Sequence, residues 1–294
     1  MFHTSGLPSM AAGCLVAVLV LASTHPIVPA DVSGSDPVSA FNSRALGSPG
    51  IRRVRLELQS DGATTRSFDI VHAWSENDGG VSSIVLLDAP ETLRGTSYLW
   101  FEDQRRANGL SIFLRLPAGA RRVLAIEPSR FDEGLLGSDF SYLDLLWRIP
   151  VTGRQMQSLG ETSLDGTPVD AVDSRPASTA SASSTPWASI EYYFARDSHL
   201  LIGAAYFAPE GGRRAKAPAK TLRVSGWSAH DGVWSPTSMV MSGAGGQRSV
   251  LTLLSLQPRT ARLRTDLFET STLGSIADRL EAGAPAASLL ERAK

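Results

Sequence analysis

The sequence predicts a mainly β protein built on one large antiparallel sheet. Many short segments alternate apolar and polar residues with a period of two, which is typical of strands with one buried face. Few segments have helical periodicity, so short helices alone cannot cover a long sheet, and the sheet must close or curl to bury its apolar face. Between the segments stand Asp-Gly hairpin dipeptides, in which Gly tolerates a positive φ. They are Asp61-Gly62, Asp78-Gly79, Asp165-Gly166 and Asp231-Gly232.

The first thirty residues have the features of a secretory signal peptide. Residues 1–30 contain no Lys, Arg, Asp or Glu, and residues 11–22 form an apolar run that is too short to span a bilayer. Val28-Pro29-Ala30 offers small residues where a signal peptidase would read them. We therefore expect cleavage after Ala30 and export to the periplasm, with peripheral association with a membrane as a further option.

The cysteine content and the charge of the exported part bear on lipidation, on disulfides and on nucleic-acid binding. Cys14 is the only cysteine, and most of the apolar run follows it instead of preceding it, so we expect neither lipidation nor disulfides. The 28 basic and 29 acidic residues all lie after the leader, which makes the exported part almost neutral. This balance argues against nucleic acid as a partner.

The exported part is expected to be one β domain, residues 51–282, between two less ordered ends. Residues 31–50 are rich in Ser, Pro and Gly and indicate a flexible tether, with one short helical turn around residues 40–46. Residues 174–186 are of low complexity and predict a mobile loop. The predicted strands are 53–58, 68–73, 83–87, 98–101, 111–116, 121–126, two between 154 and 173, 190–194, 200–207, 222–229, 234–241 and 249–256.

One helix is predicted near the carboxyl end. Within residues 271–282, Leu273, Ile276 and Leu280 recur at helical spacing on one face. Residues 283–294 are rich in Ala and are expected to fray.

The segment 131–147 is unusually apolar for a loop. Loops are normally polar and lie on the surface, whereas this one carries nine large apolar side chains. We expect it to fold back over the concave face of the sheet and to gate a hydrophobic cleft there. Within it, we expect Gly137-Ser138-Asp139 to shape a turn, with Asp139 capping a short helix that begins near Ser141.

Several motifs along the chain resemble the periplasmic outer-membrane lipoprotein-sorting family, the LolA/LolB-like proteins. They occur in the same order as in that family and cover residues 50–270. The motifs are Pro90-x-x-Leu93-Arg94-Gly95-Thr96-x-x-Leu99, the strand that ends at Leu116-Pro117, Gly137-Ser138-Asp139-Phe140 with Tyr142-x-Asp144, Asp231-Gly232-Val233-Trp234-x-Pro236-Thr237, and Leu267-Phe268. Their structural positions are Arg94, Gly95, Pro117, Gly137, Ser138, Asp139 and Asp144.

The resemblance implies an incomplete, half-open β-barrel with short helices as a lid, and a cavity that accepts acyl chains. It implies a non-catalytic carrier or chaperone for lipid or lipoprotein acyl chains, without a cofactor, and with an inner-membrane transporter or envelope protein as a possible partner. Two alternatives stay open: a regulatory or sensory protein on the same fold that binds an inner-membrane partner, and, with less support, an acyl esterase. The residues that we expect to line the cleft are Leu99, Phe101, Ile112, Leu114, Leu116, Phe140, Tyr142 and Trp147.

The sequence offers little support for other chemistry. His72, His199 and His230 lack the spacing of zinc ligands, so no metal site is expected. No Gly-x-Ser-x-Gly elbow is present, and no spacing supports a hydrolytic set of Ser138, Asp139 and His230. Four arginine pairs are interpreted as solvated strand edges and loops, with docking to an acidic partner or lipid head groups as the functional alternative. They are Arg52-Arg53, Arg105-Arg106, Arg121-Arg122 and Arg213-Arg214.

Overall fold

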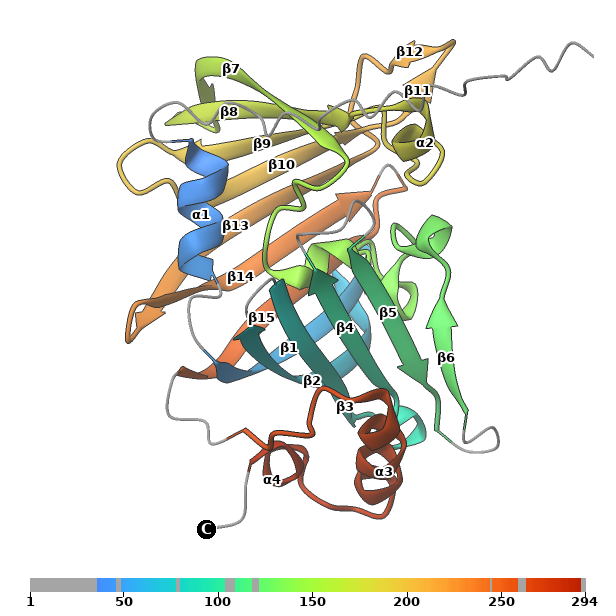
Figure 1. Ribbon diagram of the computed structural model, residues 1–294. Coiled ribbons are helices and arrows are strands. Elements are labelled where there is room, and N and C mark those ends of the chain that lie inside the picture. The colour runs from blue at the N-terminus through green and yellow to red at the C-terminus, as the bar shows by residue number, and fades with distance from the viewer. Residues whose placement is uncertain are drawn as a thin grey trace, which may run out of the picture. The chain divides into compact units, whose positions relative to one another are not determined.

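The computed structural model describes residues 36–45, 49–77, 80–103, 109–117, 122–243, 245–258 and 263–291. Within these residues thirteen strands form one antiparallel sheet, in the order β6-β5-β4-β3-β2-β1-β15-β14-β13-β10-β9-β8-β7 (Figure 1). The sheet consists of two meanders that are joined where β1 pairs with β15. Its two edges are β6 and β7, so the described sheet is not closed into a barrel. The predicted fold class, a large antiparallel sheet with few short helices, is confirmed.

The strands of the first meander follow the predicted alternation closely. They are β1 (Gly50–Ser60), β2 (Ala63–Asn77), β3 (Gly80–Ala89), β4 (Ser97–Asp103), β5 (Leu110–Arg115) and β6 (Val123–Ile126), with a 3-10 helix η1 (Glu91–Leu93) before β4.

The second meander is built in the same way from hairpins. Its strands are β7 (Arg154–Leu164), β8 (Thr167–Pro176), β9 (Ser189–Ala195), β10 (Leu201–Phe207), β13 (Lys220–His230), β14 (Val233–Gly243) and β15 (Arg248–Pro258). A short helix α2 (Thr179–Ala182) lies in the segment 174–186 that was predicted as a mobile loop, and β11 (Pro209–Glu210) and β12 (Arg213–Arg214) form a separate small hairpin.

The chain between the two edge strands must cross the sheet. β6 and β7 are consecutive in the sequence yet lie at opposite edges, so residues 127–153, the crossover segment, have to connect them. This segment contains three 3-10 helices, η2 (Pro128–Arg130), η3 (Leu135–Gly137) and η4 (Leu143–Leu146). In Figure 1 it runs in light green through the middle of the view, between the two meanders.

The crossover segment packs into the larger of two hydrophobic clusters, which we call the crossover-face cluster. Side chains from strands of both meanders take part in it, among them Trp74 and Trp100 from the first and Phe194 and Tyr206 from the second. Because strands from both meanders contribute to one cluster, the sheet curls around the crossover segment. The buried crossover residues are Phe131, Leu135, Phe140, Tyr142, Leu145, Leu146, Trp147 and Ile149.

The other face of the first meander is covered by two helices, and we call their cluster the helix-face cluster. Helix α3 (Thr270–Glu281) contacts β4, β5 and β6, and helix α4 (Ala286–Leu290) contacts β2 and β3. The predicted helix is thereby confirmed. The prediction that residues 283–294 fray is wrong for residues 286–290. These residues form α4 and bury Ala286, Leu289 and Leu290 on the sheet.

Near the amino end, part of the predicted tether is the helix α1 (Pro37–Ala45), which contacts β14. The Asp36 carboxylate accepts hydrogen bonds from the backbone N–H groups of Val38 and Ser39, which stabilises the first turn. Val38 and Phe41 are buried, and the Phe41 ring lies 5.8 Å from that of Trp227. The predicted leader, residues 1–30, lies outside the described residues.

Gly137 is expected to stabilise the crossover segment through its backbone conformation. Its φ is +79°, and a Cβ there would meet only the Arg66 side chain, at 3.5 Å. Gly137→Ala should therefore lower the free energy of unfolding by about 1–2 kcal/mol, the cost of left-handed backbone for an L-residue. Urea unfolding checks this value.

Gly274, inside helix α3, supplies the matched control. A Cβ at Gly274 would meet nothing within 4 Å, so Gly274→Ala should raise stability by about 0.5–1 kcal/mol. Equal effects at the two positions would contradict the role assigned to Gly137.

Candidate functional site

The structure divides the residues that were predicted to line the cleft between two faces of the sheet. Ile112, Phe140, Tyr142 and Trp147 are buried in the crossover-face cluster, and Leu114 packs against it half-buried.

Leu99 and Phe101 belong instead to the helix-face cluster, beneath the carboxyl-terminal helices. Leu116, just past the end of β5, is 45% exposed. The physical reason is the alternation of side chains along paired strands. Leu99 lies opposite Phe113, whereas Trp100 lies opposite Ile112, so the two pairs face different clusters. A cleft under the crossover segment can use Ile112 and Leu114 but not Leu99 or Phe101.

The motif residues Arg94 and Gly95 hold the helix layer in place. Arg94 donates hydrogen bonds to the Asp88 carboxylate and to the Ala284 carbonyl, each at 3.3 Å. Gly95 has a φ of +95°, and a Cβ there would lie 2.3 Å from the Glu281 Cγ atom of α3. Pro117 follows the end of β5, as the sequence predicted.

Asp139 does not cap the short helix, so that prediction is wrong. The Asp139 backbone N–H donates to the Ser249 hydroxyl, and this hydroxyl donates to the Asp139 carboxylate, both at 2.9 Å. The carboxylate that accepts the backbone N–H and the hydroxyl of Ser141 belongs to Asp144, at 2.8 Å in each case. Asp139 therefore ties the crossover segment to β15.

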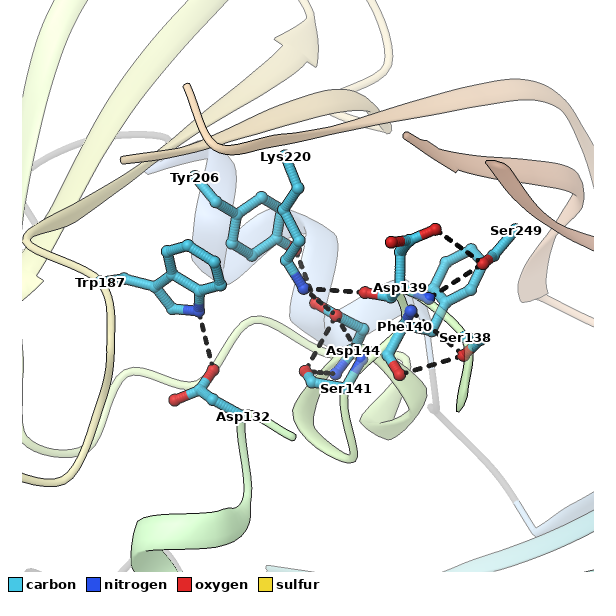
Figure 2. A network of polar contacts seen from close by, with 10 residues as sticks. All are labelled: Asp132, Ser138, Asp139, Phe140, Ser141, Asp144, Trp187, Tyr206, Lys220 and Ser249. Atoms are coloured by element: carbon cyan, nitrogen blue, oxygen red, sulfur yellow. Dashed lines mark hydrogen bonds and ion pairs between the residues drawn. The ribbon is translucent and has the colours of Figure 1, made fainter. Parts of the chain in front are cut away.

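Asp144 is the centre of a buried polar network that joins the crossover segment to the second meander (Figure 2). Its carboxylate forms an ion pair with Lys220 of β13 at 2.9 Å and accepts a hydrogen bond from the Tyr206 hydroxyl of β10 at 2.6 Å. The Lys220 ammonium also donates to the Asp139 carbonyl at 3.1 Å and lies 4.3 Å from the centre of the Tyr206 ring. Lys220 and Asp144 are both largely shielded from solvent, since their side chains are only 8% and 10% exposed.

The electrostatics of this network keep Asp144 ionised. Burial by itself would raise the pKa of the Asp144 carboxyl, but the Lys220 charge and the hydrogen bonds from Tyr206, Ser141 and Lys220 lower it overall. Burial and the neighbouring Asp144 charge raise the pKa of the Tyr206 hydroxyl well above its ordinary value, so this hydroxyl stays protonated and donates. At neutral pH the Asp144 carboxylate is therefore ionised and accepts its hydrogen bond from the Tyr206 hydroxyl.

Two further polar contacts hold the crossover segment nearer its ends. The Asn42 side-chain amide of α1 donates to the Ile149 carbonyl at 2.9 Å and accepts from the Ile149 N–H at 2.8 Å. The Trp187 indole N–H donates to the Asp132 carboxylate at 3.0 Å (Figure 2). The crossover segment is therefore fixed by a small number of specific polar contacts on top of its apolar packing.

The prediction that the arginine pairs are solvated fails at Arg52. Arg52 is completely buried on the crossover face, beside His72 and the rings of Trp74 and Trp147. A sequence signal existed, because Arg52 is in phase with Val54 and not with the exposed Arg53. Arg105, Arg106 and Arg121 lie outside the described residues, while Arg213 and Arg214 are exposed in β12.

The contacts of the described residues support neither a hydrolytic set nor a metal site. The Ser138 hydroxyl bonds to the Phe140 backbone, and His230 is exposed at the end of β13 without a hydrogen bond to Ser138 or Asp139 in this part of the chain. No cluster of three potential metal ligands occurs among the residues that the structure describes. None of the described helices is long and apolar enough to cross a membrane.

Comparison with known proteins shows where this fold occurs. A family model whose description reads "-like: Uncharacterized protein" matches residues 79–275, which is more than half of the chain. The chain belongs to this family. No curated protein matches the sequence.

The solved structures that share the fold include the following three. A domain named for outer membrane lipoprotein sorting from Vibrio parahaemolyticus is 19% identical, with a TM-score of 0.70, and the match covers 82% of this chain and 98% of that one. A DUF1329 family protein from Desulfovibrio piger is 21% identical, with a TM-score of 0.63 and coverage of 81% and 99%. A LolA superfamily protein from Nitrosomonas europaea is 17% identical, with a TM-score of 0.59 and coverage of 80% and 96%.

These likenesses confirm the predicted resemblance at the level of the fold. The chain has the fold of the LolA superfamily and of lipoprotein-sorting domains. At such identities the likeness does not extend to ligands, so function has to be argued from the contacts of the crossover segment.

Lys220→Met is expected to destabilise the protein strongly. It leaves the Asp144 carboxylate buried without its cation, and removing one partner of a buried pair costs about 3–5 kcal/mol. The double variant Asp144→Asn/Lys220→Met should recover a large part of this loss. Arg223→Met, on the same strand, removes an exposed ion pair with Asp165 and should cost about 1 kcal/mol or less. Urea unfolding at pH 7 gives all three values.

The same comparison should depend on pH in one direction. Because the pKa of Asp144 is lowered in the folded protein, its stabilising contribution is present above the ordinary carboxyl pKa and is lost as pH falls through the folded value. The difference in stability between wild type and Lys220→Met should therefore be large at pH 7 and shrink below about pH 4. A difference that grows on acidification would contradict the ion-pair assignment.

Proposed function

We propose that this protein is a non-catalytic periplasmic carrier or chaperone that binds the acyl chains of lipids or lipoproteins between the crossover segment and the sheet. The observation that carries the proposal is the crossover segment itself. It covers the apolar concave face of an unclosed sheet, and it is a connection of short 3-10 turns instead of a second sheet or a long helix.

Displacing this cover would break a limited set of polar contacts and would expose its buried apolar side chains. It is fixed to strands β13 and β15 and to helix α1 by a few polar contacts, chiefly Asp144 with Lys220, Asp139 with Ser249 and Asn42 with Ile149. Its apolar side chains occupy the space that an acyl chain would take. Burying each methylene of such a chain contributes about 0.8 kcal/mol, which can offset the loss of the crossover contacts. The lipoprotein-sorting name of a protein with this fold supports the same class of ligand.

The position of the crossover segment also suggests how cargo would enter. Displacement would expose the half-buried Leu114 and the aromatic rings of Tyr98 and Tyr142, which lie 5.7 Å apart across the strand–crossover interface. These side chains form an apolar surface that accommodates a chain without selecting a particular one. In this proposal the inner-membrane or envelope partner delivers or removes the cargo.

A reversible disulfide tests whether the crossover segment must move. Asp139 and Ser249 are already in side-chain contact, so Asp139→Cys/Ser249→Cys should form a disulfide between the crossover segment and β15. The exported part otherwise has no cysteine. The oxidised variant should bind an environment-sensitive fluorescent fatty acid at least about tenfold more weakly than the reduced one, because burial of only two methylenes is worth that factor. Equal affinity in both states would show that the segment is not a gate.

A charge placed under the crossover segment should weaken binding by itself. Leu114→Glu would put a carboxylate on the crossover face, where its desolvation is costly, and should reduce fatty-acid affinity by about tenfold or more. Ser111→Glu is the matched control, since Ser111 is exposed on the same strand. Arg115, the neighbour of Leu114 on the other face of the strand, is not a suitable control position. It is buried on the helix face and paired with Asp278 at 2.7 Å. Unchanged affinity in a folded Leu114→Glu variant would move the binding surface elsewhere.

A further inference from the structure

Arg52 is a buried cation without a counter-charge. Its side chain has no exposed surface, and its guanidinium lies between the ring of Trp74, at 4.2 Å, and the ring of Trp147, at 4.3 Å. Arginine is almost never fully buried unless it is paired. Among the described residues, however, no carboxylate forms an ion pair with Arg52.

One edge of the Arg52 guanidinium also makes no hydrogen bond with the described residues. Nη1 donates to the Ser235 hydroxyl at 3.2 Å, whereas Nε and Nη2 have no partner in the described part of the chain. Nε–H and Nη2–H are the two parallel donors that grip a carboxylate or phosphate in a bidentate way. The free edge of Arg52 is therefore the edge that recognises an oxyanion.

The neighbouring side chains add further unused polar groups. His72 lies opposite Arg52 on the adjacent strand, and neither of its ring nitrogens has a partner among the described residues. The same holds for the indole N–H of Trp74, whose ring lies 5.4 Å from that of His72. Such groups are expensive to bury unsatisfied, so a cluster of them in one place calls for an explanation.

The charge of the cluster favours an anion. Burial lowers the pKa of Arg52 to about 9, so the guanidinium remains protonated at neutral pH. Burial and the Arg52 charge hold the pKa of His72 well below its ordinary value, so the imidazole is neutral there. The cluster therefore carries one uncompensated positive charge.

One wall of the cluster belongs to the crossover segment. Trp147, which stacks on Arg52, directly follows η4 in the crossover segment and has a φ of +59°. Trp74, His72 and Ser235 belong to the sheet and would stay in place when the crossover segment is displaced. Displacement would thus open the guanidinium toward the same space that an acyl chain would enter.

We propose that Arg52, with His72 and Ser235, binds the oxyanion head of an acyl lipid, a carboxylate or phosphate, beneath the crossover segment of the carrier. This proposal rests on the proposed function and deepens it by naming the ligand as an anionic amphiphile. Stacking between two tryptophan rings accommodates the guanidinium faces, but it leaves the in-plane Nε–H and Nη2–H donors without a partner. An anion in that plane would satisfy both donors and neutralise the charge.

The experiment compares hexadecanoate with hexadecanol, which has the same chain without the charge. Wild type at pH 7 should bind hexadecanoate about tenfold to hundredfold more tightly than hexadecanol, the range expected for hydrogen bonds to a charged group. Arg52→Met should bind both ligands with the affinity that wild type has for hexadecanol. Arg53→Met, the exposed neighbour on the other face of β1, should retain the wild-type preference.

The outcomes separate this inference from the proposed function. Binding of neither ligand by wild type would overturn the carrier proposal itself. Equal binding of both ligands by wild type would overturn the anion site alone, and this comparison does not depend on the folding of any variant. Arg52→Lys keeps the positive charge but lacks the two parallel N–H donors of the guanidinium. It should therefore retain only part of the preference for hexadecanoate over hexadecanol.

Two controls identify the source of the anion and exclude a purely structural role. Acetate and inorganic phosphate, which lack a chain, should compete with hexadecanoate only at concentrations at least about a hundredfold higher. Competition at similar concentrations would mean a site for a free anion and not for a lipid head. Without ligand, the urea midpoint of Arg52→Met should be no lower than that of wild type, because an unpaired buried charge is removed. A markedly lower midpoint with an unchanged ligand preference would make Arg52 a packing residue.

Discussion

The architecture depends on one topological constraint, which is that consecutive strands lie at opposite edges of an unclosed sheet. The chain leaves β6 at one edge and must re-enter at β7 on the other, so the crossover segment is forced over the concave face. Backbone buried in this way has to find hydrogen-bond partners. The apolar side chains of the segment complete the core, and its polar side chains, Asp144 foremost, satisfy groups that would otherwise be buried alone.

Local signals were enough to predict most of the fold. Period-two alternation located the strands, and Asp-Gly pairs marked turns such as those at Asp165 and Asp231, which both adopt a positive φ. The order of the strands could not be predicted, because the pairing of β1 with β15 joins segments that are distant in sequence. Helix α4 was missed, and only a short helical turn around residues 40–46 was predicted where α1 lies, for a related reason. Their composition is that of a linker, and they are stabilised by burying residues such as Phe41 and Leu289 against the sheet.

The candidate site was only partly visible in the sequence. Alternation showed that Leu99 and Phe101 share a face, but only tertiary packing decides which cluster that face joins. The importance of Asp144 could not be deduced, since its partners Tyr206 and Lys220 are far along the chain. The prediction that Arg52 is solvated was wrong. Its phase with Val54 pointed inward, but a charged residue next to another arginine was interpreted as solvated.

The β1–β15 pairing also has a kinetic consequence. Each meander consists of hairpins whose partners are neighbours in sequence, so each can form early, whereas β1 must wait for the last strand of the chain. Contacts between distant segments are slow to form because the intervening chain has to be ordered first. Until β15 arrives, β1 presents an unpaired edge, and such edges promote aggregation. A chain that emerges with its amino end first would therefore expose the edge of its first six strands to aggregation. This exposure lasts until the final strand, β15, pairs with β1.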